Sequence, residues 1–265
     1  MRFLSIASGS SGNCIYIGDE KTHLLIDTGI SKKRVEEGLN SIGLSLMDID
    51  GILLTHEHSD HIMGLGVILR KYDIPVYGSA GTIDAVKYSK YVDKVDMNLF
   101  REIDIDKKFK INTLTVNPFE ISHDATMPCA YKVNSNEKSC AVATDMGCYN
   151  DYIVNNLTDT DVMLLEANHD IRMLQTGPYP YYLKQRILSD HGHLCNEMSG
   201  RLIDSLLCDK TKKIFLGHLS KENNFPDLAY ESVRAEINLS ESAHNADDFD
   251  ISVAHRDKPS ECIEF

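Results

Sequence analysis

One short segment carries the densest set of metal-binding side chains in the chain. Thr55-His56-Glu57-His58-Ser59-Asp60-His61 places three imidazoles and a carboxylate at H-x-H-x-D-H spacing, directly after the apolar run 52–54. A strand end can hold such ligands rigidly around a dication. Side chains alternate along extended backbone, so His56 and His58 would share one face. A turn after the strand would direct Asp60 and His61 toward a second ion. The spacing predicts a metal site, and a solvated polar loop is the alternative.

Four further acidic or imidazole residues stand at the ends of expected strands elsewhere in the chain. They are Asp27 after 24–26, His123 after 119–122, Asp145 after 140–144 and His218 after 214–217. Each alone has an ordinary explanation, because Asp is a common turn residue and a lone His usually satisfies a local hydrogen bond. Their shared position at the ends of expected strands makes them candidate ligands.

The elements that must position these residues are read from apolar runs and turn residues. Strands are predicted at 3–7, 14–17, 22–26, 52–55, 75–77, 109–116, 130–133, 139–144, 162–166, 213–216 and 251–255. Helices are predicted at 32–42, 63–71, 81–90, 196–207 and 227–238. This order indicates an α/β fold in which two mixed β-sheets pack face to face with helices outside. No repeat or linker interrupts the chain, so we expect one domain, 1–265.

Composition limits the classes of function. The 265 residues, 42% of them apolar, can bury a large core. The net charge of −13 opposes nucleic-acid binding through bulk electrostatics, although bound dications or a local basic patch would offset it. Seven cysteines without a C-x-x-C pair fit a reducing cytoplasm. The start of the chain lacks the apolar segment of a secretory signal, and no stretch reaches 18 apolar residues. We therefore expect a cytoplasmic location and no membrane partner.

The ligand candidates as a set resemble a known family. Asp27, the H-x-H-x-D-H segment, His123, Asp145 and His218 are similar to the five motifs of the metallo-β-lactamase superfamily in order, residue type and flanking strands. The resemblance covers about residues 1–255. It implies an αββα metallo-β-lactamase sandwich with two divalent metal ions at one edge of the sheets. Zinc or manganese would suit these ligands, as would iron, because the set lacks thiolate.

The resemblance also assigns roles by position. One ion would be held by His56, His58 and His123, and the other by Asp60, His61 and His218. Asp145 would bridge the two ions. Asp27 would orient a ligand without binding an ion itself.

Other segments narrow the resemblance to one group. Ser8–Asn13, Leu165–Asp170, His191–Glu197 and Gly217–Asn224 look like those of the YycJ/WalJ group of bacterial DNA exonucleases and, more loosely, of tRNA 3′-processing nucleases. The resemblance implies that His193, or else His169, protonates the leaving oxygen or binds phosphate. Asp60 is a catalytic candidate as well as a ligand. The candidate substrate-binding residues in these segments are Ser10, Asn13 and Asn168.

A segment rich in tyrosine and basic residues lies between two of the motifs. Residues 172–186 contain three Tyr, three basic residues and Gly-Pro turns. We expect a loop that stacks bases and meets phosphates through Arg172 and Lys184. A surface loop that only caps the core is the alternative.

Three functions remain open from the sequence. The first is a phosphodiesterase, specifically a DNA exonuclease, in which two dications sharing Asp145 convert a water to hydroxide for in-line attack on phosphorus. The second is a thioester or ester hydrolase of the glyoxalase II type, which shares H-x-H-x-D-H and which the acidic charge favours. The third is a metal-holding regulatory protein, which the complete ligand set disfavours. The metal, DNA against RNA, strand polarity and oligomeric state stay open.

Overall fold

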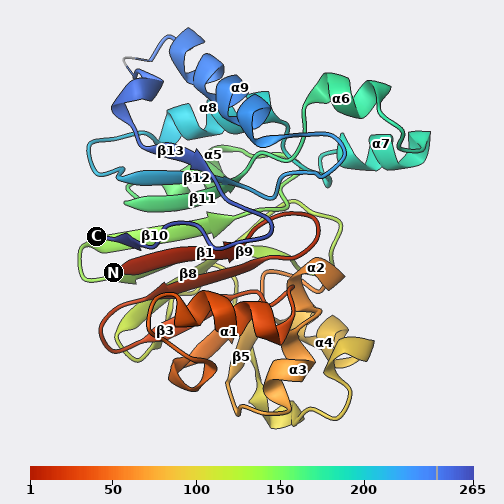
Figure 1. Ribbon diagram of the computed structural model, residues 1–265, viewed down its shortest axis with the longest axis vertical. Coiled ribbons are helices and arrows are strands. Elements are labelled where there is room, and N and C mark those ends of the chain that lie inside the picture. The colour runs from red at the N-terminus through yellow and green to blue at the C-terminus, as the bar shows by residue number, and fades with distance from the viewer. Residues whose placement is uncertain (243) are drawn as a thin grey trace.

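Short runs rich in β-branched and aromatic residues form two seven-stranded sheets in the computed structural model, which describes residues 1–242 and 244–265 (Figure 1). The first sheet has the order β14-β1-β2-β3-β4-β5-β6 and the second β13-β12-β11-β10-β9-β8-β7. The strands of the first are β1 Arg2–Ala7, β2 Cys14–Gly18, β3 His23–Ile26, β4 Gly51–Leu53, β5 Val76–Ser79, β6 Phe100–Ile103 and β14 Ile263–Glu264. Those of the second are β7 Phe109–Ile111, β8 Leu114–Glu120, β9 Cys129–Ser135, β10 Lys138–Ala143, β11 Val162–Glu166, β12 Lys213–Gly217 and β13 Ile251–Val253.

Helices cover the outer face of each sheet (Figure 1). The helices on the side of the first sheet are α1 Lys32–Asn40, α2 Ser59–Ile62, α3 Leu65–Leu69 and α4 Ala80–Lys87. Those on the side of the second are α5 Asp151–Leu157, α8 Asn196–Leu206 and α9 Pro226–Leu239. The apolar faces of these helices are buried against the sheets in two separate hydrophobic clusters. The remaining two helices, α6 Ile171–Thr176 and α7 Tyr181–Ile187, project from the body.

The two sheets bury a third apolar cluster between them. Phe3 of β1 stacks on Phe215 of β12 with ring centroids 5.6 Å apart, so the sheets are in direct contact. Both sheets are mixed: β3 to β6 run parallel in the first, and β10 to β13 run parallel in the second. The α/β class and the helix-sheet-sheet-helix sandwich expected from the sequence are therefore confirmed.

Two expectations about local structure are wrong. Residues 109–116 form two strands, β7 and β8, because Asn112 adopts a positive φ of 46° and turns the chain. Residues 172–186 form helices α6 and α7, not a loop. The side chain of Asp170 accepts a hydrogen bond from the backbone N–H of Met173 and caps α6, and the following residues favour helix. Gly177-Pro178 then separates the two helices.

In the part of the chain that the structure describes, no helix combines the length and apolar character needed to span a lipid bilayer.

Candidate metal centre

The candidate ligands meet where parallel strands of both sheets end. Asp27 follows β3, Asp145 follows β10 at a distance of two residues, and His218 follows β12. All three have positive φ values, 58°, 61° and 54°, in a region that residues other than glycine seldom adopt. Such strain persists only where the surrounding structure imposes it, and it concentrates at functional sites. The left-handed turns aim all three side chains away from the course of their strands, at the same edge of the sandwich.

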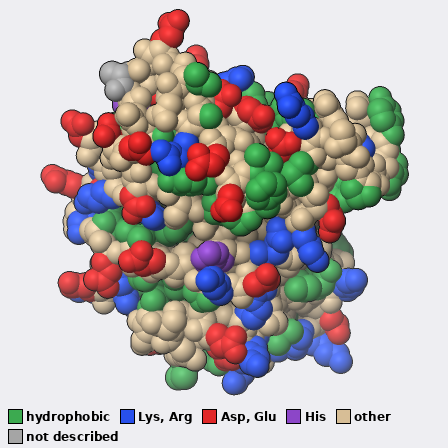
Figure 2. Space-filling model, turned by 45° about the horizontal axis from the view of Figure 1, so that its top comes forward, with side chains coloured by type: hydrophobic (Ala, Val, Ile, Leu, Met, Phe, Trp, Pro, Cys, Tyr) green, Lys and Arg blue, Asp and Glu red, His purple; other side chains and the backbone are tan. Residues whose placement is uncertain are grey.

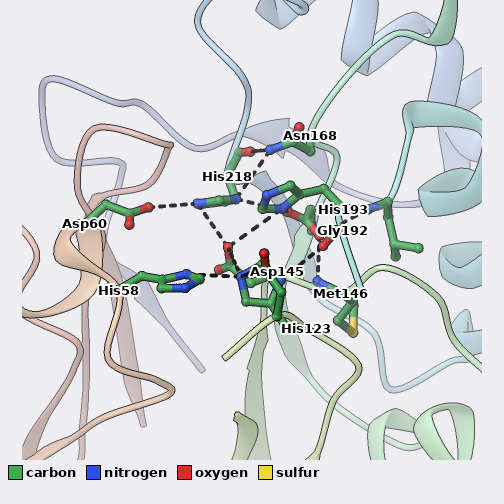
Figure 3. A network of polar contacts seen from close by, with 12 residues as sticks. His58, Asp60, His123, Asp145, Met146, Asn168, Gly192, His193 and His218 are labelled. Carbon is green, nitrogen blue, oxygen red and sulfur yellow. Dashed lines mark hydrogen bonds and ion pairs between the residues drawn. The ribbon is translucent and has the colours of Figure 1, made fainter. Parts of the chain in front are cut away.

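The structure brings every predicted ligand into one cluster. Nitrogen or carboxylate atoms of three residues lie within 4.8 Å of one another in each of three overlapping sets: His56, His58 and His123; Asp60, His61 and His218; and His56, His61 and Asp145. Asp145 stands between the first two sets, with Asp60 and His218 on one side and His58 and His123 on the other (Figure 3). Its carboxylate lies 3.3 Å from His61 Nε2 and 3.4 Å from His218 Nε2.

Hydrogen bonds fix which nitrogen of each imidazole faces the centre. The Nδ1–H of His61 donates to Asp27 Oδ2 at 2.7 Å, and that of His218 donates to Glu166 Oε1 at 2.9 Å. His123 donates from Nδ1 to the carbonyl of Gly192 at 3.1 Å. In all three rings Nε2 is therefore the atom presented inward. Such outer contacts set the tautomer and basicity of metal-binding histidines.

The chemistry of this donor set fits divalent cations. His56 Nε2 is buried and has no hydrogen-bond partner among the residues that the structure describes. Burial, together with the neighbouring His61, holds the pKa of His56 well below its usual value, so the ring is neutral and keeps a lone pair for a metal. Burial alone would raise the pKa of Asp145, but the imidazoles of His218 and His61 hold it well below the ordinary range. A carboxylate together with imidazole nitrogens that give up their protons when a metal binds is a ligand set for zinc, manganese or iron.

Glu166 is a residue of the site that the sequence reasoning missed. It ends β11 and is fully buried, and its Oε1 accepts hydrogen bonds from His193 Nδ1 at 2.8 Å and His218 Nδ1 at 2.9 Å. Oε2 accepts from the backbone N–H of Met146 at 2.8 Å. Burial would raise the pKa of Glu166, but His193 and His218 lower it to about 2, so it is a carboxylate at neutral pH. The sequence did contain a signal for Glu166, because this acidic residue ends the apolar run 162–165 in the same way that the candidate ligands end theirs.

The two candidate acids lie in different environments. The His193 side chain is 16% exposed, and its Nδ1 lies 3.7 Å from Asp145 Oδ1 and 2.8 Å from Glu166 Oε1. His169 is 1% exposed, and burial lowers its pKa to about 4, so its ring is neutral at pH 7. A neutral, enclosed imidazole is a poor proton donor. The geometry therefore favours His193, with His169 packed behind it.

The three candidate substrate-binding residues near the centre, Ser10, Asn13 and Asn168, differ in their exposure to solvent. Asn13 and Asn168 are enclosed: Asn13 accepts from the backbone N–H of Gly9 at 2.9 Å, and Asn168 donates to the carbonyl of His218 at 2.9 Å. Their amides hold the loops that carry ligands, so their geometry supports a positioning role. Ser10 alone of the three is exposed, at the tip of the 8–13 loop.

Helices α6 and α7 form an arm, and the segments before and after it in the sequence lie at the metal centre. The chain leaves the centre after His169 and returns to it at His193. Arg186 of α7 forms an ion pair with Asp124, which is the sequence neighbour of the candidate ligand His123. Lys184 donates to the carbonyls of Gln175 and Gly177 at 2.8 and 2.7 Å. Those contacts give Lys184 a role in joining α7 to α6. Arg172 is exposed and lies on the same arm.

Replacing Asp27 with Asn should leave most of the metal bound and slow turnover by about 10–100-fold, as expected for loss of an outer contact. Asn tolerates the positive φ at this position, and its oxygen can still accept from His61, but it cannot match the charge of the carboxylate. Elemental analysis beside a steady-state rate checks this. A variant that binds no metal would show Asp27 to be a ligand itself.

Comparison with known proteins identifies the family. The sequence matches the family described as "Beta-lactamase superfamily domain" over residues 22–217. It is 42% identical over 229 residues to exodeoxyribonuclease WalJ of Streptococcus pneumoniae, covering 86% of this chain and 85% of that protein. It is 39% identical over 241 residues to exodeoxyribonuclease YycJ of Bacillus anthracis, covering 88% of each.

A solved structure supports the fold independently. The crystal structure of Zn²⁺-bound PqqB from Methylobacterium extorquens aligns with a TM-score of 0.73 over 100% of both chains, at 15% identity. At 15% identity this likeness supports the fold alone, and the family is shown by the sequence matches above. The resemblance seen in the five motifs is confirmed: this chain belongs to the beta-lactamase superfamily, in the group that includes the WalJ and YycJ exodeoxyribonucleases.

Proposed function

We propose that the protein is a metal-dependent phosphodiesterase that acts on DNA as an exonuclease. The observation that carries the proposal is the pair of exodeoxyribonuclease relatives, which match 86% and 88% of this chain. The complete His/Asp cluster supplies what a metal-dependent hydrolase of this fold needs. The same proposal treats residues 1–265 as one domain, because both sheets contribute residues to a single centre. The seven cysteines form no disulfide within the described residues, which supports a cytoplasmic location.

Two dications, zinc or manganese, would be held by the residues already placed at the centre. His56, His58 and His123 would bind one ion, and Asp60, His61 and His218 the other, with Asp145 shared by both. When bound, such ions acidify a water and offset charge on the phosphoryl oxygens.

The chain's own groups then position the substrate and move the proton. Glu166 accepts from His193 Nδ1, which leaves Nε2 as the atom that faces substrate. From that position, His193 Nε2 is the atom that would pass a proton to the leaving oxygen. Glu166 also orients His218, so one buried carboxylate couples the acid to the ligand set. Asp60 is both a ligand and a negative charge beside His218, at 3.4 Å.

We assign the α6–α7 arm to binding of single-stranded DNA substrate. Tyr181 and Tyr182 are 77% and 75% exposed, and the projection carries hydrophobic side chains at its outer end (Figure 2). Exposed aromatic rings bind single strands by stacking on bases, which tolerates any sequence. With Arg172 exposed on α6, the arm offers stacking surfaces and a cation.

Replacing Tyr181 and Tyr182 together with Ala should weaken binding of single-stranded DNA by about 1–3 kcal/mol for each lost stack. Fluorescence anisotropy with a labelled oligonucleotide measures this, and an aryl phosphodiester too small to reach the arm should be hydrolysed as before. Tyr88→Ala is the matched control, because Tyr88 is 88% exposed and lies after α4. If the double variant binds DNA as well as the control does, the arm has no part in binding.

The competing thioesterase function is tested by substrate comparison. The metal-loaded protein should hydrolyse a labelled oligodeoxynucleotide with a kcat/KM far above its value for a glutathione thioester. Higher activity on the thioester, with none on DNA, would overturn the proposal in favour of the glyoxalase II type.

A further inference from the structure

Two arginines from distant parts of the sequence meet beside the centre. Arg34 of α1 donates from Nη2 to the backbone carbonyl of Arg256, at 2.6 Å, and Arg256 donates from Nη2 to the carbonyl of Leu219, at 2.9 Å. Leu219 directly follows the candidate ligand His218. The two side chains are therefore linked, through backbone contacts, to the edge of the metal centre.

Neither guanidinium has a carboxylate partner among residues 1–242 and 244–265. Arg186, Arg201 and Arg234 differ from this pair, since each forms an ion pair with Asp or Glu. Arg256 Nε is also buried without a hydrogen-bond partner in the described structure. In a chain of net charge −13, two arginines that meet with no acid beside them leave positive charge available to an anion.

The 8–13 loop packs directly on Arg256, the second member of this pair. A Cβ at Gly9 would lie 3.1 Å from Arg256 Nε, which shows how closely the loop approaches this side chain, and the φ of +156° favours glycine there. Ser8 connects the loop to both neighbours: its N–H donates to the carbonyl of His255 at 3.1 Å, and its hydroxyl accepts from the N–H of His218 at 2.9 Å. The loop also reaches the metal ligands, because the N–H of Asn13 donates to the carbonyl of Asp60 at 2.8 Å.

The tip of this loop offers free donors next to the arginines. Ser10 and Ser11 are exposed, and their backbone N–H groups make no hydrogen bond within the described residues. Unused backbone N–H groups beside guanidinium groups are the donor set that binds phosphate oxygens.

We propose that Arg34, Arg256 and the Ser10–Ser11 tip bind a backbone phosphate of the nucleic-acid strand on the Asp60–His218 side of the centre. This inference rests on the proposed function. The arm approaches the centre from the opposite side, where Arg186 pairs with Asp124 beside His123. The strand would thus be held on both sides of the scissile bond, by charge at the arginine pair and by stacking at the arm.

The test is the double variant Arg34→Gln with Arg256→Gln, assayed on a single-stranded oligodeoxynucleotide and on bis(p-nitrophenyl) phosphate. KM for the oligonucleotide should rise on the order of tenfold for each lost charge-assisted contact, with kcat and the small diester unaffected. The log-log salt slope of binding should flatten by about 0.7 for each lost phosphate contact on a single strand. Arg101→Gln, on edge strand β6, removes the same charge away from this surface and should change neither quantity.

Three outcomes would overturn the inference. An oligonucleotide KM and salt slope equal to those of the Arg101 control would remove the pair from substrate binding. Equal losses on both substrates, or lost metal, would show that the arginines only support the His218 loop. Wild-type protein that hydrolyses the small diester but not the oligonucleotide would refute the proposed function itself. If the double variant fails to fold, Arg34→Gln alone gives the same test, because the hydrogen bond to the Arg256 carbonyl is the only one its side chain makes in the described structure.

Discussion

Replacing Asp145 with alanine should empty both ion sites and abolish turnover. Its carboxylate lies within 3.4 Å of His61 and His218 Nε2 and within 3.8 Å of His123 Nε2, so it serves both halves of the cluster. Loss of an outer contact costs about 10–100-fold in metal affinity, and loss of a shared ligand should cost more than that for each ion. Elemental analysis after desalting is the measurement, with activity recorded on the same sample.

Asp73→Ala is the matched control for that variant, because Asp73 is an exposed carboxylate away from the centre. It should keep the metal content and rate of the wild type. An Asp145→Ala protein that retained two full equivalents of metal would remove Asp145 from its bridging position. Loss of a single equivalent would assign it to one ion alone.

Replacing His193 with alanine should leave both metals bound and lower kcat on DNA by roughly 10²–10⁴-fold, the usual contribution of a general acid. The loss should shrink for a p-nitrophenyl diester, because that leaving group has a low pKa and departs without a proton. Glu166 connects the acid to His218, so Glu166→Gln should reproduce part of the same selective loss on DNA. The ratio of the two rates separates an acid from a residue that only packs.

His244→Ala is the control for this series, because His244 is a partly buried imidazole that lies 3.4 Å from Asp204 on α8. It should leave both rates unchanged. If His193→Ala lowers both rates by the same factor, His193 acts in binding or packing and donates no proton. If the variant loses metal, His193 belongs to the ligand set together with Glu166 and Asp145, a group whose ligand atoms also lie within 4.8 Å of one another.

The clustering of the candidate ligands could be predicted from the sequence because its signal is local. H-x-H-x-D-H follows an apolar strand, and Asp27, Asp145 and His218 each stand at a strand end, so the residue types and the turns point to one edge. Apolar runs likewise predicted two sheets with helices outside, because sheets of this kind bury one face against each other and the other under helices.

What the sequence could not give depends on contacts between distant residues. Glu166 reads as an ordinary strand residue until the fold brings His193 and His218 against it. The Gly-Pro and Tyr residues of 172–186 suggested a loop, but the Asp170 cap and Lys184 contacts stabilise two short helices. The Arg34–Arg256 pair spans 222 residues of sequence, so only the packing of α1 beside the C-terminal segment shows it.

The account is tested most directly by comparing linear and covalently closed single-stranded DNA of the same sequence with the metal-loaded protein. An exonuclease needs a free end, so the linear strand should be shortened to small products while the circle stays intact. Removal of metal by a chelator should stop the reaction, and added zinc or manganese should restore it. Cleavage of the circle would show an endonuclease, and no cleavage of either DNA by protein that holds two metal equivalents would contradict the proposed function.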